Sequence, residues 1–362
     1  MRLYRTELYK IYQNKIFRIG IIAATGLLLL YFGLVEVGSE IATVDGVFYS
    51  GYEAVQMNRK ITEEFEGILT DEKVDQIIEK YGLPSKLEEN MPGWRDGNFL
   101  NDFVTRFFTD GAWENGIYPT ERYSLDETEL GKACEKAGKM PYLAYTTGWK
   151  VFVEMLQFGL ILGSILIICA VSAVFAEESQ TRMLPLLFST EEGRKKDVPA
   201  KILAAFTFTI SIFLWIVLLD LVLCYMVYGL KGADNISWIV LSVSRIQIQS
   251  VVFSKYLTVL LGFGFEAMLS LCAVTLCVSA YQNNCSGAVI IAAVCWGLPV
   301  LIRMFFGGFM ALIVNSMPVF MIMPEMVNDI YSIWGLALGI NLCFAIICLL
   351  KGALFYKKKQ FA

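Results

Sequence analysis

Six long apolar segments alternate with polar segments along the chain. Each contains a run of roughly 20 mostly apolar residues, which is the length that a helix needs to cross about 30 Å of hydrocarbon. The pattern therefore predicts an all-α integral membrane protein with six transmembrane helices. The predicted spans are residues 16–35, 150–176, 201–229, 256–280, 287–309 and 331–351.

The polar region 36–149 has a helical pattern of its own. Apolar residues recur at helical spacing within 55–81, and Thr70 stands where the N-cap of a second helix is expected. The phenylalanines of 99–108 and the pattern of 127–137 predict two further helices. We therefore expect a mostly helical extracytoplasmic domain inserted between helices one and two. Its aromatic residues either bind a ligand or form its core and its contact with lipid: Trp94, Trp113, Tyr118, Tyr123 and Trp149.

Two shorter segments complete the outer side. Residues 230–255 lie between the third and fourth predicted spans and are expected to form an outer loop. After the fifth span, Pro299, Arg303 and the Gly307-Gly308 pair interrupt an apolar stretch. Because non-helical backbone at membrane depth must be buried in protein or line a cavity, we expect a re-entrant or extracytoplasmic hairpin at 310–330.

The distribution of charge predicts the orientation. The whole chain has a net charge of −4, whereas 36–139 carries 22 acidic and 11 basic residues. The basic residues elsewhere cluster before the first span, between the second and third, and in the tail 352–362. Since such clusters stay in the cytoplasm, we expect both termini inside and 36–149 outside, in a multi-pass protein of the cell membrane.

The composition excludes several kinds of chemistry. The chain has no histidine and no Gly-x-x-x-x-Gly-Lys-Ser/Thr loop, which removes histidine-based triads, histidine metal sites and that nucleotide-binding loop. Cys134 is the one cysteine predicted outside, so no disulfide is expected there. We therefore predict no catalytic, cofactor or metal site, and no nucleic-acid partner.

The segment between the second and third spans, FAEESQTRMLPLLFSTEEGRKKDVPAK (175–201), is neither a plain loop nor a plain helix. Its paired carboxylates are expected at a helix N-terminus, apolar residues follow, and Gly193 is expected to reverse the chain. It is either a short element that fills a groove on a soluble partner or an ordinary amphipathic loop. The residues expected to contact such a partner are Glu177, Glu178, Thr181, Leu184, Leu186, Leu187, Phe188 and Arg194.

This segment resembles the signature of ABC-2-type ABC transporter permeases. The positions that match the family pattern are Phe175, Glu178, Thr181, Leu184, Leu186, Leu187, Ser189, Thr190, Gly193, Arg194 and Lys201. Gln180 stands where the family usually has glycine, and Pro185 interrupts the leucine run. The resemblance also implies an amphipathic interfacial helix at 1–15, with Leu8, Tyr12 and Ile16 on one face.

The resemblance implies the function as well. It predicts the membrane-spanning subunit of an ATP-driven exporter, which has no ATPase site of its own. ATP and Mg²⁺ are expected in a separate ATP-binding subunit, and the other partners are a second permease copy or a homologous permease and the lipid bilayer. The acidic, aromatic outer domain favours a peptide or antimicrobial-type substrate.

Charged and small residues inside the spans suggest further roles. Asp220, Glu266 and Arg303 are expected to line a substrate path, because ionisable groups within spans are costly. The same carboxylates allow an alternative, a secondary transporter, and the outer domain allows another, a membrane sensor or immunity protein. Pairs of glycines at Gly159 and Gly163 and at Gly335 and Gly339 predict close helix contacts of spans two and six.

Overall fold

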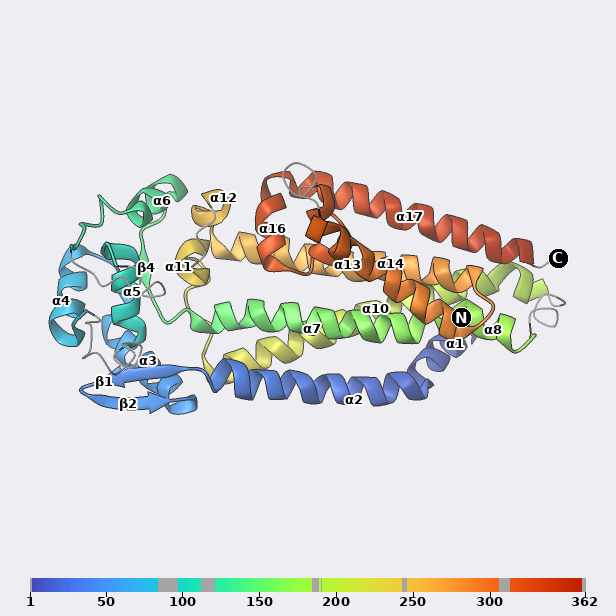
Figure 1. Cartoon of the computed structure of the whole chain (residues 1–362), viewed down its shortest axis with the longest axis horizontal. Coiled ribbons are helices and arrows are strands. Elements are labelled where there is room, and N and C mark those ends of the chain that lie inside the picture. The colour runs from blue at the N-terminus through green and yellow to red at the C-terminus, as the bar shows by residue number, and fades with distance from the viewer. Residues whose placement is uncertain are drawn as a thin grey trace. The chain divides into compact units, whose positions relative to one another are not determined.

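The computed structural model describes residues 2–83, 97–111, 121–183, 189, 191–242, 246–305 and 313–359. Within them, six helical segments are long and apolar enough to cross a membrane (Figure 1). This confirms the predicted all-α class and indicates a multi-pass membrane protein. The six segments are Lys15–Val37, Thr147–Gln180, Lys196–Val227, Phe253–Tyr281, Cys285–Phe305 and Pro324–Lys358.

The chain divides into two compact units. The first unit comprises residues 1–28, 156–219 and 258–362, and the second comprises 29–155 and 220–257. Each unit is described by itself below.

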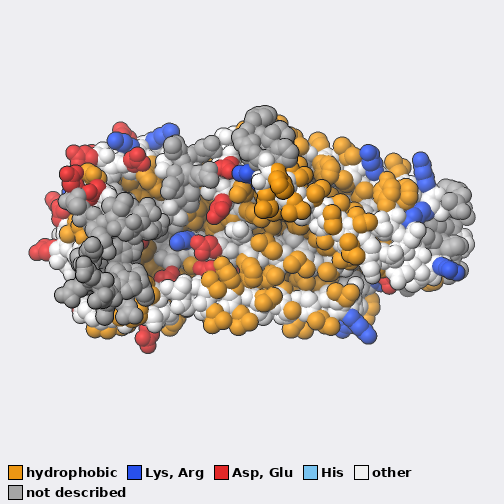
Figure 2. Space-filling view, in the orientation of Figure 1, with side chains coloured by type: hydrophobic (Ala, Val, Ile, Leu, Met, Phe, Trp, Pro, Cys, Tyr) orange, Lys and Arg blue, Asp and Glu red, His pale blue; other side chains and the backbone are white. Residues whose placement is uncertain are grey.

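The first unit is a bundle of long helices. Its elements are α1 (Arg2–Gln13), most of α2 (Lys15–Leu30), most of α7 (Thr147–Val171), α8 (Ala173–Gln180), much of α10 (Glu191–Val227), most of α13 (Phe253–Tyr281), α14 (Cys285–Phe305), the 3₁₀ turns η4 (Pro318–Phe320) and η5 (Tyr331–Ile333), α16 (Pro324–Ile330) and α17 (Trp334–Lys358). Many large apolar side chains of these helices are exposed, among them Ile19, Leu218, Ile290 and Leu354. Figure 2 shows hydrophobic side chains gathered over a broad part of one face of the molecule, as expected for helices in contact with lipid.

The helix ends of the first unit differ from the prediction at three places. Helix α10 begins at Glu191, so Gly193 lies inside a helix and does not reverse the chain. Glutamate, lysine and alanine, which are good helix formers, make up much of the start of α10 and extend it towards the N-terminus. Helix α17 continues to Lys358, so most of the predicted tail is helical. Helix α1 ends at Gln13, and the Asn14 side chain accepts a hydrogen bond from Ile16 N at the start of α2.

Helix α1 packs on α10 by a face that is shifted from the predicted one. Glu7 and Ile11 are buried, Tyr12 is half-buried, and Ile16 is 64% exposed. The Tyr12 hydroxyl shares a 2.5 Å hydrogen bond with Ser211 Oγ. The sequence did not predict Glu7 on the buried face of α1, because a charged side chain is not expected there without a partner.

The segment after α14 packs against the bundle. Val314, Val319 and Phe320 form a small core with α14 residues such as Trp296. Asn341 of α17 donates hydrogen bonds to the backbone oxygens of Ser316 at 2.5 Å and Ala337 at 3.0 Å. The described part of the predicted 310–330 hairpin therefore forms short helical turns that are held by the fifth and sixth spans.

The second unit contains most of the described part of region 36–149. It is made of a π-helix η1 (Tyr31–Val37), strands β1 (Ile41–Val44) and β2 (Val47–Ser50), α3 (Tyr52–Phe65), β3 (Gly67–Ile68), α4 (Asp71–Tyr81), α5 (Phe99–Phe108), α6 (Glu129–Ala137), β4 (Tyr142–Leu143), α11 (Ser237–Leu241) and α12 (Ile246–Gln249), with the adjoining ends of α2, α7, α10 and α13. The four expected helices are present, and Thr70 Oγ1 accepts a hydrogen bond from Lys73 N as the N-cap of α4.

Two short antiparallel strand pairs were not predicted, of which the first is a hairpin. Strands β1 and β2 pair from Ile41 opposite Ser50 to Val44 opposite Val47, and β3 pairs with β4. Asp45 and Gly46 join β1 to β2 with φ values of 52° and 75°, as in the Asp-Gly turns that favour two-residue hairpins. The core of the unit lies between α3, α4, α5, α6 and α11, and includes Ile61, Val74, Phe103, Leu130 and Ile239.

Candidate functional site

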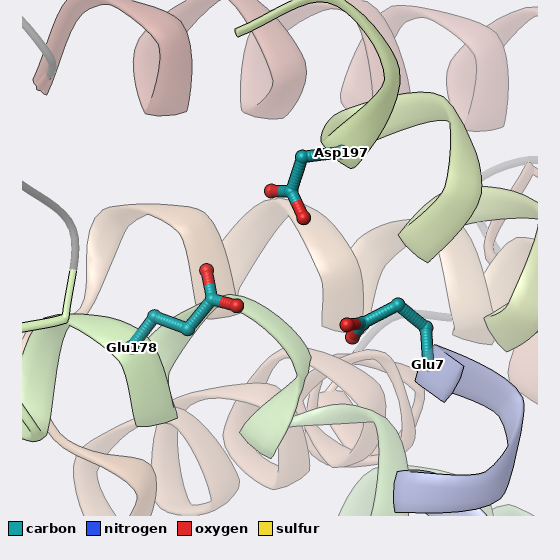
Figure 3. Close-up of side chains that lie close together, drawn as sticks. All are labelled: Glu7, Glu178 and Asp197. Atoms are coloured by element: carbon teal, nitrogen blue, oxygen red, sulfur yellow. The ribbon is translucent and has the colours of Figure 1, made fainter. Parts of the chain in front are cut away.

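Four charged side chains meet in the first unit, around the ammonium group of Lys201. The Lys201 Nζ lies 2.6 Å from Glu178 Oε1, forms a hydrogen bond with Asp197 Oδ1, and lies 3.9 Å from Glu7 Oε2. The Lys201 side chain is fully buried, and the three carboxylates are nearly so. Figure 3 shows Glu7, Glu178 and Asp197 converging from three helices. We call Glu7, Glu178, Asp197 and Lys201 the ionic cluster.

The ionic cluster joins three helices and is hydrogen-bonded to a fourth. Glu7 comes from α1, Glu178 from the last turn of α8, and Asp197 and Lys201 lie four residues apart near the start of α10. The Tyr356 hydroxyl on α17 donates a hydrogen bond to Glu178 Oε2. Both oxygens of the Glu178 carboxylate are thus bonded, one to a lysine and one to a tyrosine.

Pairing of opposite charges allows most of this cluster to be buried, although Asp197 Oδ2 has no hydrogen-bond partner among the described residues. An unpaired buried charge costs several kcal/mol, whereas a paired and fully hydrogen-bonded one is tolerated. Lys10 adds a second positive charge at the edge, because its Nζ donates a 2.7 Å hydrogen bond to Glu7 Oε1. Burial lowers the pKa of Lys10, but the hydrogen bond and the charge of Glu7 outweigh it and raise this pKa above 10.5.

The three carboxylates have a spacing that can hold a cation. One oxygen of each lies within 4.8 Å of the others, and carboxylate oxygens are the ligands that Mg²⁺ and Ca²⁺ prefer. The Lys201 ammonium, however, is bonded to two of the three carboxylates. The cation of this site is therefore the lysine itself, and the arrangement is that of a structural ion cluster.

Helix α8 is fixed by a serine of another span. Ser279 Oγ on α13 accepts hydrogen bonds from Phe175 N at 3.0 Å and Ala176 N at 3.1 Å, and donates one to Ser172 O at 2.7 Å. These bonds bridge the break between α7 and α8, where helical N–H groups lack intrahelical partners. The Phe175 ring also packs on Tyr356, with ring centroids 4.5 Å apart. The position of Glu178 is thus set by α13 and α17.

Gln180, which departs from the family pattern, has a local role. Its side-chain oxygen accepts a 3.0 Å hydrogen bond from Cys285 N, the first residue of α14. Lys359 donates to Gln282 O at 3.1 Å and Asn283 Oδ1 at 3.0 Å in the same turn. A glycine at position 180 would leave the Cys285 N–H without this acceptor.

The predicted partner-contacting residues separate into three groups. Glu178 is buried in the ionic cluster, whereas Glu177 and Thr181 are exposed. Both glutamates lie in the last turn of α8, so the expected helix N-terminus at this point is wrong: the apolar α7 continues past its break into α8, and Arg182 leaves the helix with a φ of 58°. Leu184, Leu186, Leu187, Phe188 and the Arg194 side chain lie outside the described residues.

The predicted substrate-path residues have different surroundings. Asp220, in the second unit, is fully buried, and neither carboxylate oxygen has a hydrogen-bond partner among the described residues. Glu266, in the first unit, accepts a 2.5 Å hydrogen bond from Ser270 Oγ. Because they belong to separately described units, their common site stays a prediction.

Arg303 takes part in a network with the segment that follows α14. Its Nε donates a 2.9 Å hydrogen bond to Asn315 Oδ1, and Asn315 Nδ2 donates a 3.1 Å bond to Asp329 Oδ2. Asn315 is almost completely buried. These contacts hold the segment after α14 in place, and Arg303 thereby has a packing role that the sequence did not suggest.

Sequence reasoning missed Glu7, Asp197, Tyr356 and Ser279. The spacing of Asp197 and Lys201 was a usable signal, because side chains four residues apart on a helix are neighbours. No comparable signal pointed to Glu7 or Tyr356, which reach the cluster from opposite ends of the chain. No family model matches the chain, and no curated protein or solved structure is significantly similar to it.

Proposed function

We propose that the chain is the membrane-spanning subunit of an ATP-driven transporter of the ABC-2 permease type. In this proposal it acts as an exporter in the cell membrane, with both termini in the cytoplasm. A separate ATP-binding subunit holds ATP and Mg²⁺, and a second permease copy or a homologous permease completes the path.

The observation that supports this proposal is the ion pair between Glu178 and Lys201. These residues are two charged positions of the family-like signature, and they lie on either side of the segment that is expected to contact the ATP-binding subunit. They are 23 residues apart and 2.6 Å from each other. An ordinary polar loop has no need of a buried ion pair at its base.

The ionic cluster suggests how motion passes to the spans. Movement of segment 177–196 by the ATP-binding subunit displaces Glu178, near the start of this segment, and Asp197, which directly follows its end. Since both are bonded to Lys201, and Glu178 also to Tyr356, α8, α10 and α17 move together. Helix α1 follows through Glu7. The chain thus converts motion of its partner into tilting of helices.

The substrate is proposed to be a peptide. The net charge of −11 between residues 36 and 139 attracts cationic peptides over the range that salt permits, about 8–10 Å at physiological ionic strength.

Co-purification tests the partner. Replacing Leu186 and Leu187 by aspartate removes two apolar side chains of the expected contact, so we expect the ATP-binding subunit to be lost from the purified complex. Met140→Asp, at a 72% exposed residue of the second unit, is the matched control and should retain it. Wild-type recovery of an ATPase with the double variant, at equal membrane insertion, contradicts the proposal.

A sensor or immunity protein is the second candidate, and it is favoured by a cavity of about 330 Å³ in the second unit, which is lined by Glu40, Phe103 and Lys150 among others. In that case a kinase or regulator co-purifies in place of an ATPase. A secondary transporter is distinguished by uptake into liposomes that is driven by a proton gradient without ATP, and that is abolished by Asp220→Asn or Glu266→Gln.

A further inference from the structure

The second unit contains a cavity of about 330 Å³. It lies at the junction of the start of β1, the start and one face of α5, the first turn of α7 and the end of α11. This volume is at the lower end of the range of small-molecule sites, which is about 300–1,000 Å³. The cavity therefore has room for a small ligand but not for a folded partner.

One wall of the cavity is aromatic. Phe99, Phe103 and Phe107 line it at intervals of four residues, which places them on one face of α5. The rings of Phe103 and Phe107 are 4.9 Å apart, and Phe107 meets Trp238 edge-on at 5.6 Å. Because these rings support one another, the wall offers a preformed apolar surface.

Buried asparagines hold the frame of the cavity. Asn58 Oδ1 accepts a 3.0 Å hydrogen bond from Phe99 N, and Asn58 Nδ2 donates a 3.2 Å bond to Ile41 O. Asn98 caps α5 and donates a 3.1 Å bond to Thr43 O. The start of α5 is thus tied to β1, and the cavity is formed without a ligand.

The charged groups of the cavity fall into two sets. Asp102 and Arg106 pair with each other, 3.7 Å apart on α5. Glu40 and Lys150 also line the cavity, and the charge of Lys150 acts on the Glu40 carboxyl. Neither side chain forms a hydrogen bond or close ion pair with another described residue. The cavity therefore presents one carboxylate and one ammonium group beside an apolar wall.

We propose that this cavity binds a short zwitterionic peptide with apolar side chains. Its ammonium group pairs with Glu40, its carboxylate pairs with Lys150, and an apolar side chain packs on Phe99, Phe103 and Phe107. The inference goes beyond the transport role, because binding at this site requires no ATP-binding subunit.

Calorimetric titration of the full chain in lipid nanodiscs tests the proposal, with the dipeptide leucyl-phenylalanine as the probe. Loss of one charge-assisted contact weakens binding by about tenfold or more. We expect that loss for Lys150→Met with the free dipeptide. The C-amidated dipeptide lacks the carboxylate, so it should bind the wild type about tenfold more weakly than the free dipeptide does. Lys150→Met should cause no further loss of affinity for the C-amidated dipeptide.

Glu40→Gln gives the second half of the test. It should weaken binding of the free dipeptide by about tenfold but leave binding of the N-acetylated dipeptide unchanged. Lys80→Met and Glu64→Gln are the controls, because these residues form an exposed ion pair of the same unit that does not line the cavity. Both should bind like the wild type.

Three results overturn the proposal. One is no binding of the free dipeptide to the wild type at millimolar concentration. Another is equal binding of the free and the modified dipeptides, which removes the role of the two charges. The third is that glycylglycine, which lacks apolar side chains, binds as tightly as leucyl-phenylalanine. Failure of any of these tests leaves the co-purification test of the transport role untouched.

Discussion

The ammonium nitrogen of Lys201 lies 2.6 Å from Glu178 Oε1, across a segment of 23 residues. This pair closes the base of the segment that we propose to contact an ATP-binding subunit. Asp197 accepts a hydrogen bond from Lys201, and Tyr356 donates one to Glu178. The end of α8 and the first turns of α10 are therefore held to α17 as well. The ionic cluster should therefore contribute strongly to the stability of the first unit.

Removing the central lysine tests this contribution. Lys201→Met leaves three buried carboxylates without their main counter-charge, so we expect a loss of about 3–5 kcal/mol in the free energy of unfolding. Thermal unfolding in detergent measures the loss. Lys15→Met is the matched control, because Lys15 is an exposed lysine at the start of α2 in the same unit.

Adding Glu178→Gln to Lys201→Met removes one of the orphaned charges and should restore part of the stability. If Lys201→Met unfolds at the same temperature as Lys15→Met, the ionic cluster does not hold the helices together.

The hydroxyl of Tyr356 makes a narrower test. Tyr356→Phe keeps the ring on Phe175 but removes the hydrogen bond to Glu178 Oε2. A buried charged acceptor that loses its donor costs about 1–3 kcal/mol, and the unfolding temperature should fall accordingly. Tyr9→Phe, at a 63% exposed tyrosine of α1, should have no effect. Equal unfolding temperatures of the two variants would show that Glu178 does not depend on this hydroxyl.

Helix α17 approaches α13 closely at Gly352. The glycine motif at Gly335 and Gly339 does not produce this contact. A Cβ on Gly352 would lie 2.9 Å from Cys277 Cα, whereas no described atom lies within 4 Å of one on Gly339. Gly352→Ala should cost about 1–3 kcal/mol, because backbone must shift. Gly339→Ala should be neutral or stabilising by up to about 1 kcal/mol, since alanine is the better helix former. Thermal unfolding of both variants in detergent measures these changes. If Gly339→Ala were less stable than Gly352→Ala, the result would contradict the close contact assigned to Gly352.

The sequence predicted the elements of the fold well and their ends less well. Spans and outer helices follow from apolar periodicity, which depends on local sequence alone. The start of α10 at Glu191 was missed, because helix-forming residues ahead of the apolar run look like loop when polarity is the criterion. The β1–β2 hairpin was missed although Asp45-Gly46 is a strong turn signal between residues that favour strands, because only the helical pattern that begins at residue 55 was used.

The candidate site was predictable only in part. Glu178 and Lys201 were recognised from the segment's resemblance to a family signature. Glu7 and Tyr356 join them from opposite ends of the chain, and Lys201 and Tyr356 reach the same carboxylate of Glu178. Contacts between residues so distant in sequence depend on how the helices pack. A single sequence contains no periodic signal for that packing.

Glu40, which we propose to bind the ligand's ammonium group, should also affect the stability of the second unit. Burial raises the pKa of Glu40 from 4.5 to about 7, with Lys150 lowering it and Glu154 raising it further. The folded protein thus holds this proton more tightly than the unfolded chain does. The resulting stability is fully present below about pH 4.5 and is lost as the pH rises through about 7.

Glu40→Gln should therefore unfold at the same temperature as the wild type near pH 4.5 and at a higher temperature above pH 7. Each pKa unit corresponds to about 1.4 kcal/mol, so the expected gain at high pH is about 1–3 kcal/mol. Glu64→Gln is the control, and its effect on stability should have the opposite sign. A hydrogen bond from Lys80 holds the pKa of Glu64 below 4.5, so this variant should be less stable than the wild type at high pH. Scanning fluorimetry between pH 4.5 and pH 8.5 measures both variants.

The same Glu40→Gln variant should lose affinity for the dipeptide as its fold gains stability, as expected where a charge is kept for a ligand at the expense of the fold. Parallel melting curves of variant and wild type across this range would mean that the Glu40 carboxylate is solvated, and that it is not held buried in the cavity wall.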